Sequence, residues 1–205
     1  IRQSLVGSEM CIRDRVHAIE AYTSKLKKNF YSDLLAKHAL VLLSDNITKV
    51  IEYGSDLIAR QNMLLGSSLA GQAFANAPVA AIHALAYPLG GHFHIPHGLS
   101  NALVLLPVLR VNSVVASTEY SELLDCLPNT GPHRGTEIER AETFIQKLDD
   151  LIDQVGIPRR LSKLNINEQD LPILAKDAML QQRLLINNPV EITEARALEI
   201  YQSVF

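Results

Sequence analysis

Four of the seven histidines in this chain lie in the stretch IHALAYPLGGHFHIPHGLSN, residues 82–101. His83 and His97 are fourteen residues apart, so one continuous helix would separate them by about 21 Å along its axis. Two ligands of one metal ion each lie about 2.0–2.2 Å from it, so such a helix excludes a shared site. A chain reversal removes this obstacle. We expect it at the Pro88–Gly91 corner, because proline stops a helix and glycine adopts positive φ.

The rest of the chain is typical of a series of helices. Aromatic residues make up only 5%, with no Trp, and Leu, Ala and Ile dominate, which favours helices over sheets. Apolar residues recur at three- and four-residue spacing, the pattern of a buried helical face. Together these signals predict an all-α, helical bundle-like domain, with helices near residues 16–24, 33–54, 56–76, 78–87, 96–112, 136–156, 167–182 and 193–205.

Capping residues and prolines predict where these helices begin, bend and end. We expect Ser32 or Asp33 to cap the second helix, and Gly54 to end it in a left-handed conformation. Pro78 suits the first turn of a helix, where its missing N–H is not needed. Pro107 lies inside an apolar run and predicts a kink or a join. Residues 127–136 are rich in Pro, Gly and Asn and predict a loop.

Length and charge exclude several classes of protein. The 205 residues are 47% apolar, enough for a substantial core, and 19 basic against 22 acidic residues give a net charge of −3. This balance argues against nucleic-acid binding, and no apolar run reaches the length of a membrane span. No export signal precedes the helices, and Cys11 and Cys126 are the only cysteines. We therefore expect a cytoplasmic protein that binds neither nucleic acid nor membrane.

The histidine cluster has two interpretations. Imidazoles converging on one point favour a metal site, whereas histidines near helix ends often serve only as caps. His92 and His94 lie in the predicted turn. They can support the metal ligands from behind, or they can simply be solvated. His17, three residues before Glu20, is a third candidate ligand, although a lone helical histidine is more often a core or surface residue. No HExxH or CxxC pattern points to another type of metal site.

The first fifteen residues, IRQSLVGSEMCIRDR, differ from the rest. They show no clean period of either kind, and they resemble the translation of adapter sequence joined to environmental reads. We expect residues 1–15 to be non-native and residues 16–205 to form one all-helical metal-binding domain.

Three segments carry a resemblance to a known family: HAIEAYTS, HALAYPLGGHFHIPHGLSNALVLLPVLRVN and NNPVEITEARALEIY. They resemble the carboxy-terminal domain of the iron-containing (group III) alcohol dehydrogenases, and the likeness spans about Val16 to Phe205. The resemblance implies an all-helical metal-binding domain. It also implies that this chain lacks the α/β domain with which the family binds NAD(P).

The resemblance implies a set of site residues. The family holds its metal with one Asp and three His, and the histidines fall on His17, His83 and His97. The Asp lies four residues before the first His, where this chain has Arg13; Asp14 is one residue nearer, inside the stretch that we expect to be non-native.

Two further positions follow from the same resemblance. Where the family often has another His near the substrate, this chain has Tyr87, which is the candidate catalytic residue. Tyr87 can orient the substrate, relay a proton or simply pack. An aromatic residue of the cleft wall falls on Phe74, which is therefore the candidate substrate-pocket residue.

The function implied for the parent protein is hydride transfer between a small alcohol or aldehyde and NAD(P), with a divalent metal polarising the substrate oxygen. Fe2+ is the expected metal and Zn2+ the alternative. We expect the parent to be a homo-oligomer, and this chain alone to be an inactive fragment. A domain like that of glycerol dehydrogenases or sugar-phosphate cyclases, and a non-catalytic helical interaction domain, are the alternative functions.

Overall fold

The computed structural model describes the backbone of residues 2–128 and 135–205, and the side chains of residues 10–128 and 135–205. Within these ranges the chain forms helices and no strands, so the predicted all-α class is confirmed. The elements are α1 (Arg2–Tyr22), α2 (Phe30–Glu52), α3 (Leu57–Asn76), α4 (Ala81–Phe93), α5 (His97–Leu124), α6 (Glu137–Gln154), η1 (Leu161–Leu164), η2 (Glu168–Asp170), α7 (Leu171–Ala178), α8 (Gln182–Leu185) and α9 (Glu194–Ser203).

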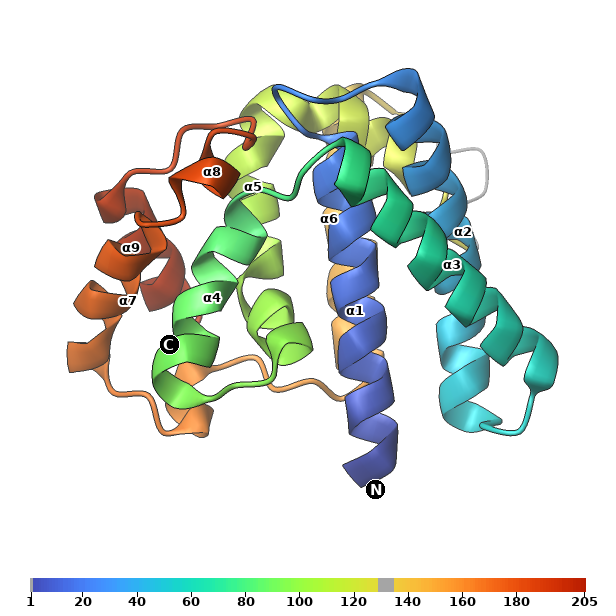
Figure 1. The fold of residues 1–205 in the computed structure, drawn as a ribbon, viewed down its shortest axis with the longest axis horizontal. Coiled ribbons are helices and arrows are strands. Elements are labelled where there is room, and N and C mark those ends of the chain that lie inside the picture. The colour runs from blue at the N-terminus through green and yellow to red at the C-terminus, as the bar shows by residue number, and fades with distance from the viewer. Residues whose placement is uncertain (1, 129–134) are drawn as a thin grey trace.

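Helix α1 runs through the middle of the molecule (Figure 1). It packs against α2 and α3 on one flank and against α5 on the other. Helix α4 packs between α5 and the short helices α7 and α8, and α6 packs along α5. Of the three helices predicted to carry metal ligands, α1 and α4 therefore both pack against α5.

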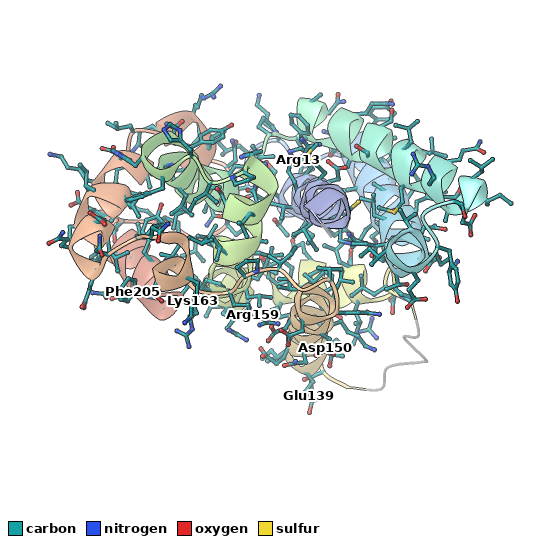
Figure 2. All side chains as sticks on the ribbon, turned by 90° about the horizontal axis from the view of Figure 1, so that it is seen from below. Arg13, Glu139, Asp150, Arg159, Lys163 and Phe205 are labelled. Carbon is teal, nitrogen blue, oxygen red and sulfur yellow. The ribbon has the colours of Figure 1, made fainter. Side chains whose placement is uncertain are left out.

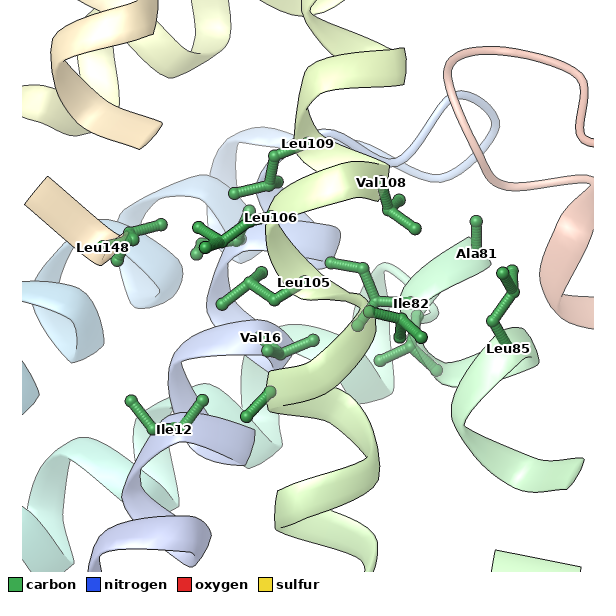
Figure 3. Close-up of a cluster of buried hydrophobic side chains, with 14 of the residues drawn as sticks. Ile12, Val16, Ala81, Ile82, Leu85, Leu105, Leu106, Val108, Leu109 and Leu148 are labelled. Carbon is green, nitrogen blue, oxygen red and sulfur yellow. The ribbon is translucent and has the colours of Figure 1, made fainter. Parts of the chain in front are cut away.

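The core that fixes these helices relative to one another is apolar and closely packed (Figure 3). Each of the contributing side chains is almost fully shielded from solvent, and burial of such side chains is the main stabilising term in folding. The residues come from α1, α4, α5 and α6: Ile12, Val16, Ile82, Leu85, Leu105, Leu109 and Leu148.

Local capping in α2 differs from the prediction. Asn29 is the N-cap, and its side chain accepts a hydrogen bond from the Ser32 amide at 3.0 Å. The Ser32 Oγ in turn accepts a hydrogen bond from the Asn29 backbone N–H, so Ser32 completes a capping box from inside the helix rather than capping it. The helix ends at Glu52 with Tyr53 as C-cap, and Gly54 is not left-handed.

The predicted reversal at the Pro88–Gly91 corner is wrong. Helix α4 continues through Pro88 to Phe93, and the chain turns at His94, which has left-handed dihedrals (φ 53°, ψ 28°). Proline costs the helix one hydrogen bond, but the neighbouring Leu85 and Leu89 are completely buried, and this burial favours a continued helix. The new helix then begins at His97 after Pro96, as predicted.

Two other prolines also differ from expectation. Pro78 lies before α4, which begins only at Ala81, because Ala80 has non-helical dihedrals. Pro107 lies inside α5 without a break, and the non-helical residue of that helix is Ala116. The helix predicted at 136–156 is confirmed as α6: Thr136 is its N-cap, and Gly156 comes after its end with φ 69°. Most of the loop predicted at 127–136 lies outside the described residues.

The boundary predicted at residue 15 is not visible in the secondary structure, because α1 runs through it without a break. Arg15 is completely buried and donates hydrogen bonds to the carbonyls of Cys11 and Leu43. Burial lowers the pKa of Arg15 to about 10, so the guanidinium stays charged at neutral pH. This side chain ties α1 to α2.

Helix α5 is long and apolar enough to cross a membrane by length and composition. However, 67% of its most apolar 18-residue window is buried inside the fold. It contacts α1, α4, α6 and α9 along its length, as the core helix of a helical domain does.

Candidate metal centre

The structure brings together the three histidines predicted as ligands. The ring centroids of His17 and His83 are 4.8 Å apart, and those of His83 and His97 are 5.3 Å apart. Rings that each bind one ion through nitrogen at about 2.0–2.1 Å, at octahedral to tetrahedral angles, have centroids about 4.6–5.3 Å apart. The observed separations match this spacing.

The helices place these rings by simple means. His17 projects from the middle of α1, His83 lies in the first turn of α4, and His97 is the first residue of α5. His83 therefore lies in the first turn of α4, whereas the helix predicted at 78–87 placed it in its second half. The reversal at His94 returns the chain so that the His97 ring, at the start of α5, lies beside the rings of His83 and Tyr87.

Burial keeps two of the imidazoles neutral. Burial, together with the neighbouring His83 and the Arg13 guanidinium, lowers the pKa of His17 to about 2. Burial, His83 and Arg13 also lower the pKa of His97 to about 4, although Glu20 opposes the shift. Neutral imidazole is the form that binds metal, so at neutral pH these rings are already in the required state.

His83 has one occupied and one free nitrogen. Its Nδ1 lies 2.6 Å from Glu20 Oε2, and its Nε2 is buried without a hydrogen-bond partner. A buried polar atom without a partner is costly, and a bound ion would supply one. This orphaned nitrogen is the observation in the site that best fits a metal ion.

The carboxylate ligand is not in place. Asp14 is buried, but its Oδ1 accepts from Arg13 Nη2 at 2.6 Å and lies 3.9 Å from His17 Nδ1. Arg13, which projects from α1 (Figure 2), thus pairs with the carboxylate that lies three residues before His17. The guanidinium also adds a positive charge near the imidazoles, which opposes cation binding.

Among residues 10–128 and 135–205, no three His, Cys, Asp or Glu side chains form a group that could hold a metal ion as they stand. The local hydrogen bonds explain this, because Asn101 Nδ2 lies 3.2 Å from His97 Nε2. His97 must exchange this contact for the ion before it can bind through that atom. The three imidazoles therefore lie together without forming a complete ligand set in this structure.

Tyr87 and Phe74 both lie against the histidines. The Tyr87 ring stacks on His97 with a centroid separation of 5.7 Å and faces the edge of His83 at 6.5 Å. Phe74 lies 4.4 Å from the His17 ring, half-buried. Both positions predicted beside the ligands are thus neighbours of them, and their roles stay predictions.

The other two histidines of the cluster lie away from this centre. His92 Nε2 contacts Asp177 of α7 at 2.6 Å. His94 is exposed and forms the left-handed turn.

Sequence reasoning assigned no role to Glu20 or Asn101. Glu20 is three residues after His17 on the same helical face, and Asn101 is four residues after His97. That spacing was the available signal. Only the fold shows that Glu20 contacts a histidine 63 residues away.

Comparisons with known proteins agree with this picture. The profile of the Fe-containing alcohol dehydrogenase family, C-terminal region, matches residues 15–205. Long-chain-alcohol dehydrogenase 1 of Geobacillus thermodenitrificans is 40% identical over 92% of this chain and 47% of its own length. The 1,3-propanediol dehydrogenase of Citrobacter freundii is 34% identical over 92% of this chain and 48% of its own length.

A solved structure extends the likeness to three dimensions. The crystal structure of a 1,3-propanediol oxidoreductase superposes with a TM-score of 0.90 at 32% identity, over 95% of this chain and 50% of that one. The chain thus spans about half the length of the relatives it matches. Within those bounds, the chain belongs to the iron-containing alcohol dehydrogenase family and corresponds to its all-helical C-terminal domain.

Proposed function

We propose that this chain is the metal-holding part of an NAD(P)-dependent alcohol dehydrogenase. The observation that carries the proposal is the meeting of His17, His83 and His97, with a buried, unpartnered His83 Nε2 among them. The family supports it, because the similar proteins are named as alcohol and propanediol dehydrogenases. The proposed substrate is a small alcohol or aldehyde.

A divalent ion bound by the three imidazoles would act as a Lewis acid toward the substrate oxygen. Tyr87, 36% exposed and stacked on His97, has its phenol available to orient the substrate hydroxyl or to relay a proton. Phe74, packed on His17, supplies an apolar wall that excludes water from the same place. We propose these two roles for the parent enzyme.

Imidazole ligands suit Fe2+ and Zn2+ alike, and we propose Fe2+ because of the family to which the chain belongs. The NAD(P) would bind to the half of the relatives' length that this chain does not match. We therefore propose that this chain by itself is inactive. We also propose that the parent is a cytoplasmic homo-oligomer.

A non-catalytic helical domain is the second candidate, and one observation favours it. Arg13 stands where the family has its Asp ligand, and it neutralises the adjacent Asp14. If this cation prevents metal binding, the helical domain remains as an interaction module. A domain like those of glycerol dehydrogenases or sugar-phosphate cyclases has no such observation in its favour here.

Calorimetric titration of the metal-free chain with Zn2+ tests the site. We expect one ion per chain, and at least a 100-fold loss of affinity when His83→Ala and His97→Ala are combined. The matched control combines His92→Ala and His94→Ala, which removes two imidazoles of the same cluster that lie outside the centre. Equal affinity of the wild type and the first double variant would contradict the proposal.

A second assay tests the proposed inactivity. The chain, loaded with Fe2+ or Zn2+, should not oxidise ethanol or 1,3-propanediol with NAD+ or NADP+. Turnover above that of the His83→Ala, His97→Ala variant would show that the chain is sufficient for activity.

A further inference from the structure

Glu20 is an acidic side chain buried at the centre of the fold, 3% exposed. Its two oxygens face two different donors. Oε1 accepts the backbone N–H of Ile82 at 2.7 Å, and Oε2 lies 2.6 Å from Nδ1 of His83. The Ile82 amide is one of the first N–H groups of α4, which have no partner within their own helix. One carboxylate thus joins α1 both to the start of α4 and to the ring that α4 carries.

The contact bears on which nitrogen of His83 carries a proton. An ionised carboxylate only accepts hydrogen bonds, so an ionised Glu20 pairs with the Nδ1–H form of the ring. In the neutral ring the lone pair then lies on Nε2. This is the buried atom that has no hydrogen-bond partner, and its ring lies between those of His17 and His97.

We propose that Glu20 is the positioning residue of the metal centre: it holds His83 in the Nδ1–H tautomer and turns Nε2 toward the other two imidazoles. This inference rests on the proposed function, because it concerns a ligand of the proposed ion. Carboxylates that bind the far nitrogen of a metal-bound histidine fix the ring and its tautomer in other proteins.

Only a carboxylate offers a separate oxygen to each donor. The amide of Gln has one oxygen and one NH2 group, so Glu20→Gln cannot serve the Ile82 amide and His83 with two different oxygens. If its oxygen keeps the Ile82 bond, its NH2 group faces Nδ1 and favours a proton on Nε2 instead. The substitution changes the shape of the side chain very little, which separates tautomer control from packing.

The first test reads the tautomer directly in the metal-free, 15N-labelled chain of 205 residues. Long-range 1H–15N correlation spectra should show His83 with its proton on Nδ1 in the wild type. In Glu20→Gln the proton should move to Nε2 in part or in full. The control Glu142→Gln makes the same chemical change at an exposed position of α6 and should leave the His83 signals unchanged.

Wild-type His83 with its proton on Nε2 would overturn the proposal even if Glu20→Gln did not fold. An unchanged tautomer in a folded Glu20→Gln variant, judged by its circular dichroism, would overturn it as well. Neither result depends on metal.

The second test measures Zn2+ affinity by calorimetry. Glu20→Gln should bind on the order of 10–100-fold more weakly than the wild type, and Glu142→Gln should bind equally. If the wild type binds Zn2+ and Glu20→Gln binds it equally well, the positioning role is wrong and the proposed function stands. If the wild type has the Nδ1–H tautomer but binds no Zn2+, the proposed function is wrong, and with it the claim that Glu20 positions a metal ligand.

Discussion

His83 and His97 are fourteen residues apart in the sequence, yet their ring centroids lie 5.3 Å apart. The chain achieves this with two helices and a single left-handed residue between them, His94. Because α1 packs against α5, the His17 ring on α1 also lies beside the His83 ring. The candidate centre therefore depends on the packing of three helices.

Gly91 should be replaceable without loss, because the turn does not use it. It lies inside α4, and a Cβ added there would meet nothing within 4 Å. Gly91→Ala should stabilise the chain by about 0.5–1 kcal/mol, since Ala favours a helix interior over Gly. Gly156, with φ 69°, is the matched opposite, and Gly156→Ala should destabilise the chain. Urea denaturation of both variants gives the comparison, and a loss of stability in Gly91→Ala would mean that the Pro88–Gly91 corner does form a turn.

Helices α2 and α4 show why local sequence rules predicted the helices better than the residues at which they begin and end. Pro88 signals a helix end by itself, but the burial of Leu85 and Leu89 outweighs the one lost hydrogen bond. Ser32 looks like an N-cap, but Asn29, three residues earlier, has an equally suitable side chain and takes that role. In both cases the helix period identified the helix, and the tertiary contacts set its ends.

The candidate site divides in a similar way. A resemblance carried by short motifs indicated which three histidines belong together, and the structure places their rings within reach of one another. The partner of His83 could not be predicted, because Glu20 meets it across 63 residues. Nothing in the sequence near His83 marks that contact. Their ligand roles stay predictions until metal binding is measured.

Replacing Arg13 with an acidic residue should strengthen metal binding. Position 13 is one helical turn before His17, where the family resemblance implies an Asp ligand, and the guanidinium there pairs with Asp14. Arg13→Asp should raise Zn2+ affinity at least 10-fold by adding a carboxylate and removing a nearby cation. Arg13→Ala removes the cation alone and should give a smaller gain. If Arg13→Asp binds no better than Arg13→Ala, position 13 does not supply a ligand in this chain.

Stability of the metal-free chain should fall as the pH is lowered from 7 to 5. The pKa values of His17 and His97 are lowered to about 2 and about 4 in the folded chain, from about 6.5 when unfolded. Above pH 6.5 both states are neutral at these rings, so stability is at its plateau. Below it the unfolded chain takes up protons that the folded chain excludes, and stability is lost as the pH falls toward 4.

Urea denaturation at pH 7.5, 6 and 5 measures this loss. Replacing His17 and His97 together with Gln removes both groups and should flatten the dependence in that window. A double variant with the same slope as the wild type would assign the pH dependence to other groups.

Tyr201 should contribute to stability through a single hydrogen bond. It is completely buried in α9, and its hydroxyl donates to the Leu85 carbonyl of α4 at 2.6 Å. Tyr201→Phe keeps the ring and leaves that carbonyl without this partner, which should cost about 1–3 kcal/mol of unfolding free energy. Tyr31→Phe is the matched control, because Tyr31 is 52% exposed and the change there should stay within about 0.5 kcal/mol. Since Leu85 lies two residues after His83, loss of this bond should also weaken Zn2+ binding if α9 helps to hold α4 in place. Equal unfolding free energies for the two variants would show that the bond between α9 and α4 adds nothing to the fold.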